Sequence, residues 1–163
     1  MNKLNVNVPP DEPLIAMART FDAPRALVWK AMTDPGHLAR WWGPRKYTNK
    51  VTAYDLRPGG KWRIEQSDAE GRTFAFHGEF REVVPRERIV QTFGMEGMFD
   101  GRVIVETMTL REKDGRTLYA VTSRFDTIAD RDGMVASGME GGASESMERL
   151  DELLAEMRTT EKA

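Results

Sequence analysis

The chain has 163 residues, which is enough for one domain with a sizeable hydrophobic core. Its formal net charge is −2, with acidic and basic residues interspersed, so no basic surface of the kind that binds nucleic acid is expected. It has no cysteine, which excludes disulfides, thiolate metal sites and thiol nucleophiles.

The two ends of the sequence are expected to be loose. Residues 1–13 are polar and rich in proline, and they lack the basic and apolar regions of a secretory signal. No run approaches the roughly 18 apolar residues of a membrane span, so a cytoplasmic protein is the expectation. We predict a single domain over residues 14–158, followed by a loose tail over residues 159–163.

The domain is predicted to begin with a strand and two short helices. Residues 14–21 (LIAMARTF) are short, apolar and bounded by turn-forming residues, as in a strand. Asp22 is expected to cap a helix that reaches Met32, with Pro24 at or near its first position, where a missing N–H costs nothing. A second short helix is expected before Trp41-Trp42-Gly43-Pro44.

The middle of the chain has the alternating pattern of antiparallel strands. Apolar residues recur with period two, and the segments are separated by turn-forming residues. The predicted strands cover residues 46–56, 61–66, 72–84, 88–93, 102–113 and 116–125. Asp114-Gly115 is a strong signal for a hairpin between the last two.

The C-terminal segment is predicted to be one long amphipathic helix over residues 130–157. Its apolar residues recur at steps of three and four, which is the period of a helix face. Its first half carries Gly133, Gly138, Gly141 and Gly142, and each helical glycine costs roughly 0.5–1 kcal/mol relative to alanine. The glycines therefore indicate either close contact with the sheet or open space for a ligand.

This order of elements indicates an α+β domain, since the helices are segregated from an antiparallel sheet. Four blocks resemble the helix-grip fold of the START-like (SRPBCC) superfamily, in the branch similar to the C-terminal domain of the activator of Hsp90 ATPase. They are RTFDAPRALVWKAMTDPGHLARWWGP (19–44), DLRPGGKWR (55–63), FHGEFREVVPRERIV (76–90) and SGMEGGASESMERLDELL (137–154).

The resemblance implies a curved sheet of about six to seven strands wrapped around the long C-terminal helix, with a largely apolar cavity between them. The superfamily includes lipid carriers, hormone receptors, polyketide cyclases and co-chaperone domains, so function stays open. The N-terminal domain with which the eukaryotic activator makes its main chaperone contact has no counterpart in these 163 residues. This weighs against an Hsp90-like chaperone as the partner.

A set of large apolar residues faces the interior of the predicted sheet and helix. Such residues form either a filled core or the wall of a ligand cavity. The large residues that we expect to contact a ligand are Trp62, Phe76, Phe93, Met108, Tyr119 and Met134. Gly138 is also expected to contact the ligand, because it leaves space beside the helix. Trp41-Trp42 is either a rim element or simple packing for the short helices.

Glu106 is the one acidic residue in an otherwise apolar row of its predicted strand, between Ile104 and Met108. If that parity holds, its carboxylate faces the helix, where a buried charge needs a partner or a raised pKa. The expected partners are Tyr119, Ser123 and Gln91. The alternative is a register shift or bulge that turns Glu106 to solvent.

Three functions follow from these residues. The first hypothesis is binding of a small hydrophobic ligand, such as a lipid or a polyketide or other aromatic molecule, with Glu106 and Tyr119 contacting and orienting its polar end. The alternatives are a cyclase or hydratase with Glu106 as acid or base, and a co-chaperone domain. The two histidines make neither a metal site nor a catalytic triad, and no cofactor is expected. Nothing in the sequence selects between a monomer and a homodimer.

Overall fold

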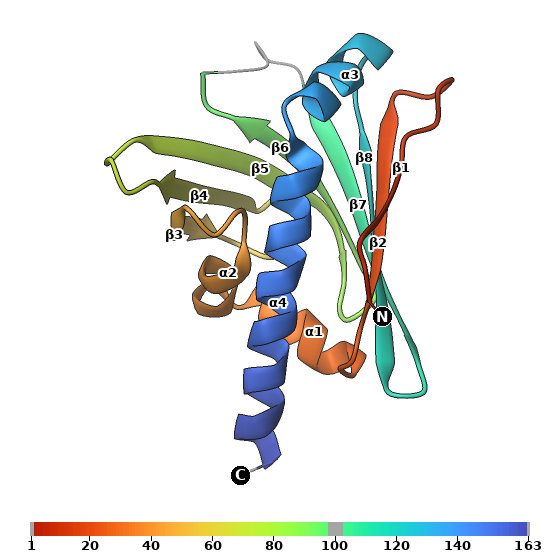
Figure 1. Cartoon of the computed structure of the whole chain (residues 1–163), viewed down its shortest axis with the longest axis vertical. Coiled ribbons are helices and arrows are strands. Elements are labelled where there is room, and N and C mark those ends of the chain that lie inside the picture. Colours follow the sequence, from red (N-terminus) through yellow and green to blue (C-terminus); the bar gives the residue numbers. More distant parts are fainter. Residues whose placement is uncertain (1, 98–102, 163) are drawn as a thin grey trace.

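The computed structural model describes residues 2–97 and 103–162. The described chain forms an eight-stranded antiparallel sheet and four helices, with the long helix α4 running across one face of the curved sheet (Figure 1). The strands are β1 (Asn5–Asn7), β2 (Leu14–Phe21), β3 (Thr48–Tyr54), β4 (Lys61–Ser67), β5 (Thr73–Val84), β6 (Arg88–Met95), β7 (Ile104–Lys113) and β8 (Arg116–Arg124). The predicted helix-grip architecture is confirmed, with one strand more than the expected upper number.

The strand order is β1-β2-β8-β7-β6-β5-β4-β3, and every neighbouring pair is antiparallel. The predicted hairpin between β7 and β8 is present. Asp114 and Gly115 both have positive φ, at 54° and 74°, as the type I′ turn of a two-residue hairpin requires. This turn fixes the register between β7 and β8, which places Glu106 opposite Ser123.

Two short helices, α1 (Arg25–Thr33) and α2 (Pro35–Trp41), carry the chain from β2 to β3 at the far edge of the sheet. They lie beside α4 at one end of the sheet (Figure 1). Asp34 caps α2 by accepting hydrogen bonds from the backbone N–H groups of Gly36 and His37. The predicted cap of α1 is wrong, because Asp22 instead pairs with Arg116 at 2.7 Å and Pro24 occupies the N-cap position.

The C-terminal segment is two helices rather than the single helix that the apolar stripe predicts. Helix α3 (Ile128–Ala136) ends near Gly138, and α4 (Met139–Lys162) begins directly after it. Gly138 has a φ of +85°, a left-handed conformation that glycine adopts without the steric cost of a Cβ. The apolar stripe from Met139 to Met157 lies wholly within α4, so it carries no information about a break before Met139.

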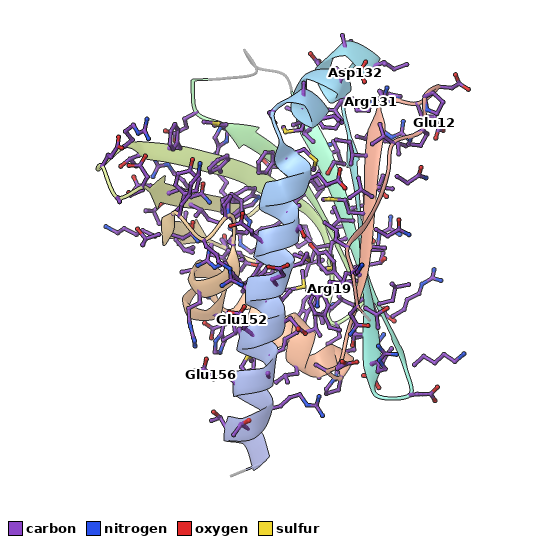
Figure 2. The ribbon with its side chains drawn as sticks, viewed as in Figure 1. Glu12, Arg19, Arg131, Asp132, Glu152 and Glu156 are labelled. Carbon is purple, nitrogen blue, oxygen red and sulfur yellow. The ribbon has the colours of Figure 1, made fainter. Side chains whose placement is uncertain are left out.

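Two segments that were expected to be loose have regular structure. Residues 5–7 form β1, which pairs with β2, and α4 continues to Lys162. The segment between β1 and β2 is also held by the buried side chain of Arg131 in α3, which donates hydrogen bonds to the backbone oxygens of Pro9 and Glu12. Figure 2 shows Arg131 at the top of the molecule beside Asp132, with which it forms an ion pair.

The main hydrophobic core lies between the sheet and α4. Leu150 and Leu154 of the helix are buried against Phe21 and Phe80 of the sheet and against the inner side of α1. Arg19 of β2 points from the sheet toward α4 (Figure 2). Its guanidinium donates to the backbone oxygen of Met147 at 2.8 Å, which ties the sheet to the helix by a charged hydrogen bond.

Candidate functional site

A cavity of about 190 Å³ lies between the sheet and α4, beside α2. Most of its wall is apolar and comes from strands β2, β3, β4, β6, β7 and β8 together with the inner sides of α1, α2 and α4. The residues that line it are Met17, Met32, Leu38, Trp41, Trp42, Tyr54, Trp62, Ile64, Ile89, Gln91, Phe93, Glu106, Met108, Tyr119, Val121, Ala143, Ser146 and Met147. Residues far apart in the sequence therefore meet at one site.

The polar part of the wall is a row across three neighbouring strands. Glu106 of β7 lies opposite Gln91 of β6 on one side and Ser123 of β8 on the other. Gln91 Nε2 donates to one carboxylate oxygen of Glu106 at 3.1 Å, and Ser123 Oγ donates to the other at 3.4 Å. The sheet register therefore aims Glu106 inward, and both of its neighbours stabilise the carboxylate.

Burial raises the pKa of Glu106, because a low-dielectric wall disfavours its ionised form, and the two hydrogen bonds offset only part of this effect. Tyr119 of β8 lines the same cavity, and burial together with the charge of Glu106 raises the pKa of its hydroxyl group. Tyr119 therefore stays neutral across the physiological range. Of these two groups, Glu106 is the one whose protonation state depends on the pH and on the surrounding wall.

Four aromatic rings stand together at the side of the cavity nearest the loop after α2. The ring of Trp42 lies 5.0 Å from that of Phe76 and 6.3 Å from that of Trp62, both edge to face. Phe93 lies 6.0 Å from Trp62 and 5.7 Å from Phe76. The rings come from the loop, β4, β5 and β6, so the tertiary fold assembles this cluster.

The position of Trp62 depends on Gly78 in the neighbouring strand β5. Trp62 is paired with Gly78 of β5, and its indole Nε1 reaches over to donate to the backbone oxygen of Thr92 at 3.3 Å. A Cβ added at Gly78 would lie 2.4 Å from Nε1 and 1.9 Å from the oxygen of Thr92. Any side chain at this position would displace Trp62 from the cavity wall.

A second, wider hollow of about 970 Å³ lies outside the cavity, between the first turns of α4 and the ends of β5 and β6. We call it the outer groove. Trp42, Phe93, Ala143 and Ser146 line both spaces, so they form the boundary between the cavity and the groove. A ligand larger than the cavity would have to pass or displace Trp42.

The loop that carries Trp42 is fastened to α4. Arg149 donates to the backbone oxygens of Gly43 and Pro44 at 3.0 and 3.2 Å. Ser146 accepts from the N–H of Gly43 at 3.1 Å and donates to the backbone oxygen of Trp41 at 3.0 Å. The boundary is thus held by hydrogen bonds as well as by packing.

The sequence model of the family described as activator of Hsp90 ATPase homolog 1-like protein matches residues 22–155. This chain belongs to that family. Its START-like resemblance is therefore confirmed, and the match includes the strands and helices that line the cavity except β2 and the last turns of α4. No curated protein matches the sequence.

Solved bacterial structures share the fold of this family member over almost their full length. A protein from Arthrobacter aurescens is 25% identical with a TM-score of 0.87, and the match covers 93% of this chain and 91% of that one. A protein from Chromobacterium violaceum is 28% identical with a TM-score of 0.75, covering 86% and 96%. One from Mycobacterium smegmatis is 24% identical with a TM-score of 0.84, covering 92% and 95%.

The structure brings five of the eight residues predicted to contact a ligand to the cavity of this family member. They are Trp62, Phe93, Glu106, Met108 and Tyr119. Phe76 and Gly138 line the outer groove instead. Met134 lines neither space, because α3 carries it to a separate small core around Ile15, Ile104 and Phe125.

Among the glycines of the C-terminal segment, Gly138 has a role other than the expected one of sheet contact or ligand space. An added Cβ at Gly138 or Gly141 would meet no atom within 4 Å, so neither glycine serves close contact with the sheet. The positive φ of Gly138 shows that it is required for the break between α3 and α4. Gly141 leaves open space beside the outer groove, whereas Gly142 lies against Pro44 at 3.2 Å from the added Cβ.

Sequence reasoning left several lining residues out of the predicted set, among them Met17, Met32, Tyr54 and Ser146. Met17 and Met32 belong to elements that were correctly predicted, but nothing local marks them as cavity residues. Trp41-Trp42 was the available signal, since two adjacent tryptophans at a helix end are costly to expose. Both line the cavity.

Neither histidine lines the cavity or the outer groove. In the described ranges, no three His, Asp or Glu side chains are grouped so that they could hold a metal ion. No helix among the described residues is long and apolar enough to cross a membrane.

Proposed function

We propose that this protein binds a small, largely apolar molecule in the cavity between the sheet and α4. The observation that carries the proposal is the cavity wall itself, which is apolar and aromatic apart from a short polar row around Glu106. Small-molecule sites have this composition, in which apolar burial supplies affinity and a few polar groups orient the ligand. Each Å² of apolar surface removed from water contributes about 25 cal/mol.

The size of the cavity limits the ligand. An apolar cavity of about 150 Å³ engineered into another protein holds benzene. The 190 Å³ available here therefore suits one ring with a short substituent. A longer molecule would extend past Trp42 into the outer groove, where Phe74, Phe76 and Met95 supply further apolar surface.

Filling the cavity from the helix side tests the proposal. Ala143 of α4 lines both the cavity and the groove, whereas Ala155 lies on the exposed side of the same helix. Ala143→Leu should abolish binding of toluene, indole and naphthalene measured by titration calorimetry, and Ala155→Leu should leave it unchanged. Both variants keep a good helix former, so the comparison isolates the filled space. Absence of binding to the unmodified protein, or equal binding by Ala143→Leu, would refute the proposal.

A second candidate function is acid or base catalysis on the bound molecule, and the inward position of Glu106 with its raised pKa favours it. Enzymes shift carboxyl groups in this direction so that a proton can be exchanged near neutral pH. Glu106→Gln would then abolish turnover of an enolisable carbonyl compound that fits the cavity, while affinity for toluene stays within about twofold. Turnover that survives this substitution would exclude Glu106 as the acid or base.

A further inference from the structure

The wall of the cavity contains one ionisable carboxyl group and no basic side chain among the described residues. Glu106 is the single acidic side chain among the described residues that line the cavity, and no lysine, arginine or histidine accompanies it there. Its two hydrogen-bond partners, Gln91 and Ser123, are neutral. The wall therefore offers one carboxylate without a cation beside it.

Two arginines on elements around the cavity, Arg19 and Arg149, direct their guanidinium groups to other partners. Arg19 of β2 donates to the backbone oxygen of Met147 and forms an ion pair with Asp151 at 3.4 Å. Arg149 of α4 donates to the backbone of the loop after α2. Since neither guanidinium lines the cavity, Glu106 is neutralised there either by a proton or by a positive charge on the ligand.

The remaining wall suits a cation as well. Trp42, Trp62 and Phe93 form a group of rings within 6.5 Å of one another, and Tyr119 lines the cavity beside Glu106. The faces of aromatic rings attract ammonium groups, and the attraction is stronger in a site shielded from water. A carboxylate and several rings around one small space are a combination that recognises an organic cation.

We propose that the ligand is a small primary or secondary amine carrying one ring, whose protonated nitrogen pairs with Glu106 while its ring packs against Trp42, Trp62 and Phe93. This inference rests on the proposed function, because it names the ligand class of the same cavity. A carboxylate ligand would bring a second negative charge to Glu106 and is disfavoured relative to the amine. A neutral alcohol can donate one hydrogen bond to Glu106 but gains no ion pair.

Four probes with the same ring test this inference: benzylamine, benzyl alcohol, toluene and benzoate. At pH 7.5, benzylamine should bind at least about tenfold more tightly than toluene, and benzoate should bind most weakly. Glu106→Gln should remove the advantage of the amine and leave toluene binding intact. The matched control is Glu79→Gln, which changes an exposed carboxylate on the opposite face of the sheet and should alter none of the affinities.

The pH dependence gives an independent readout. The affinity for benzylamine should rise with pH as Glu106 ionises above the ordinary glutamic acid pKa, since alkyl ammonium groups keep their proton up to about pH 9. Tyr54 and Tyr119 are the other titratable groups that line the cavity, and burial raises the pKa of both hydroxyls, so they stay neutral over this range. Toluene affinity should change little.

The outcomes separate the two proposals. Binding of toluene with no preference for benzylamine, or an amine preference that persists in Glu106→Gln, would overturn the amine inference and leave the proposed function standing. A preference for benzyl alcohol equal to that for benzylamine would also overturn it, because the charge would then play no part. If none of the four probes binds the unmodified protein, the proposed function fails as well.

Discussion

Two glycines three residues apart should respond to alanine with opposite signs. Gly141 lies in the first turn of α4, and an added Cβ would meet nothing within 4 Å. Gly141→Ala should therefore raise the free energy of unfolding by about 0.5 kcal/mol, the lower part of the range for a helical glycine. Gly138 has a φ of +85°, where a Cβ costs roughly 1–2 kcal/mol, so Gly138→Ala should lower it by about that amount.

Urea denaturation followed by far-UV circular dichroism measures both changes, and thermal melting should shift by about 2–4 °C for each kcal/mol in a domain of this size. Gly133→Ala in α3 is the control for propensity alone, because it also adds a Cβ that meets no atom within 4 Å. It should stabilise the protein by roughly 0.5–1 kcal/mol. A neutral or stabilising Gly138→Ala would refute the claim that this glycine fixes the break between the helices. A destabilising Gly141→Ala would show that the space beside it is filled.

Two further substitutions test the interior charges. Because the folded state raises the pKa of Glu106, it holds a proton that the unfolded chain has already lost above the ordinary pKa of 4.5. The contribution of Glu106 to stability should therefore fall as pH rises above 4.5, and Glu106→Gln should remove this component in urea titrations at successive pH values. A difference in stability between the two proteins that does not change over this pH range would contradict the buried carboxylate. Arg19→Ala should cost about 1.5–3 kcal/mol through loss of its charged hydrogen bond to α4, whereas Arg57→Ala, which breaks an exposed ion pair, should cost less than about 1 kcal/mol in the same assay. Equal costs would show that the sheet is not held to the helix through Arg19.

The case of Glu106 shows how far sequence reasoning reaches toward a site. Its alternation with Ile104 and Met108 indicates the inward face, and the regular β7 ladder on both sides preserves that parity. The partners Gln91 and Ser123 were also predictable, because each shares the inward parity of its own strand. What the sequence does not contain is the register between strands, which decides whether these three side chains stand opposite one another.

Met134 and Trp42 show the opposite limit. Met134 lies in the segment predicted to be one helix, but the break at Gly138 separates α3 from α4, and Met134 packs, partly buried, against a different core. Trp42 lies in a loop with no periodicity, and its place at the cavity boundary depends on hydrogen bonds from Ser146 and Arg149, more than a hundred residues later. Contacts of this range follow from the closed fold and leave no local pattern.

The sequence by itself determined the strands from β2 to β8, the two short helices, the hairpin at Asp114-Gly115 and the inward position of Glu106, because periodicity and turn chemistry act over neighbouring residues. The tertiary structure alone decided which inward residues surround empty space and which are packed. That choice depends on the curvature of the sheet, the angle of α4 and the path of the loop after α2, which are set by many distant contacts at once. The cavity with its single carboxylate is the product of that geometry.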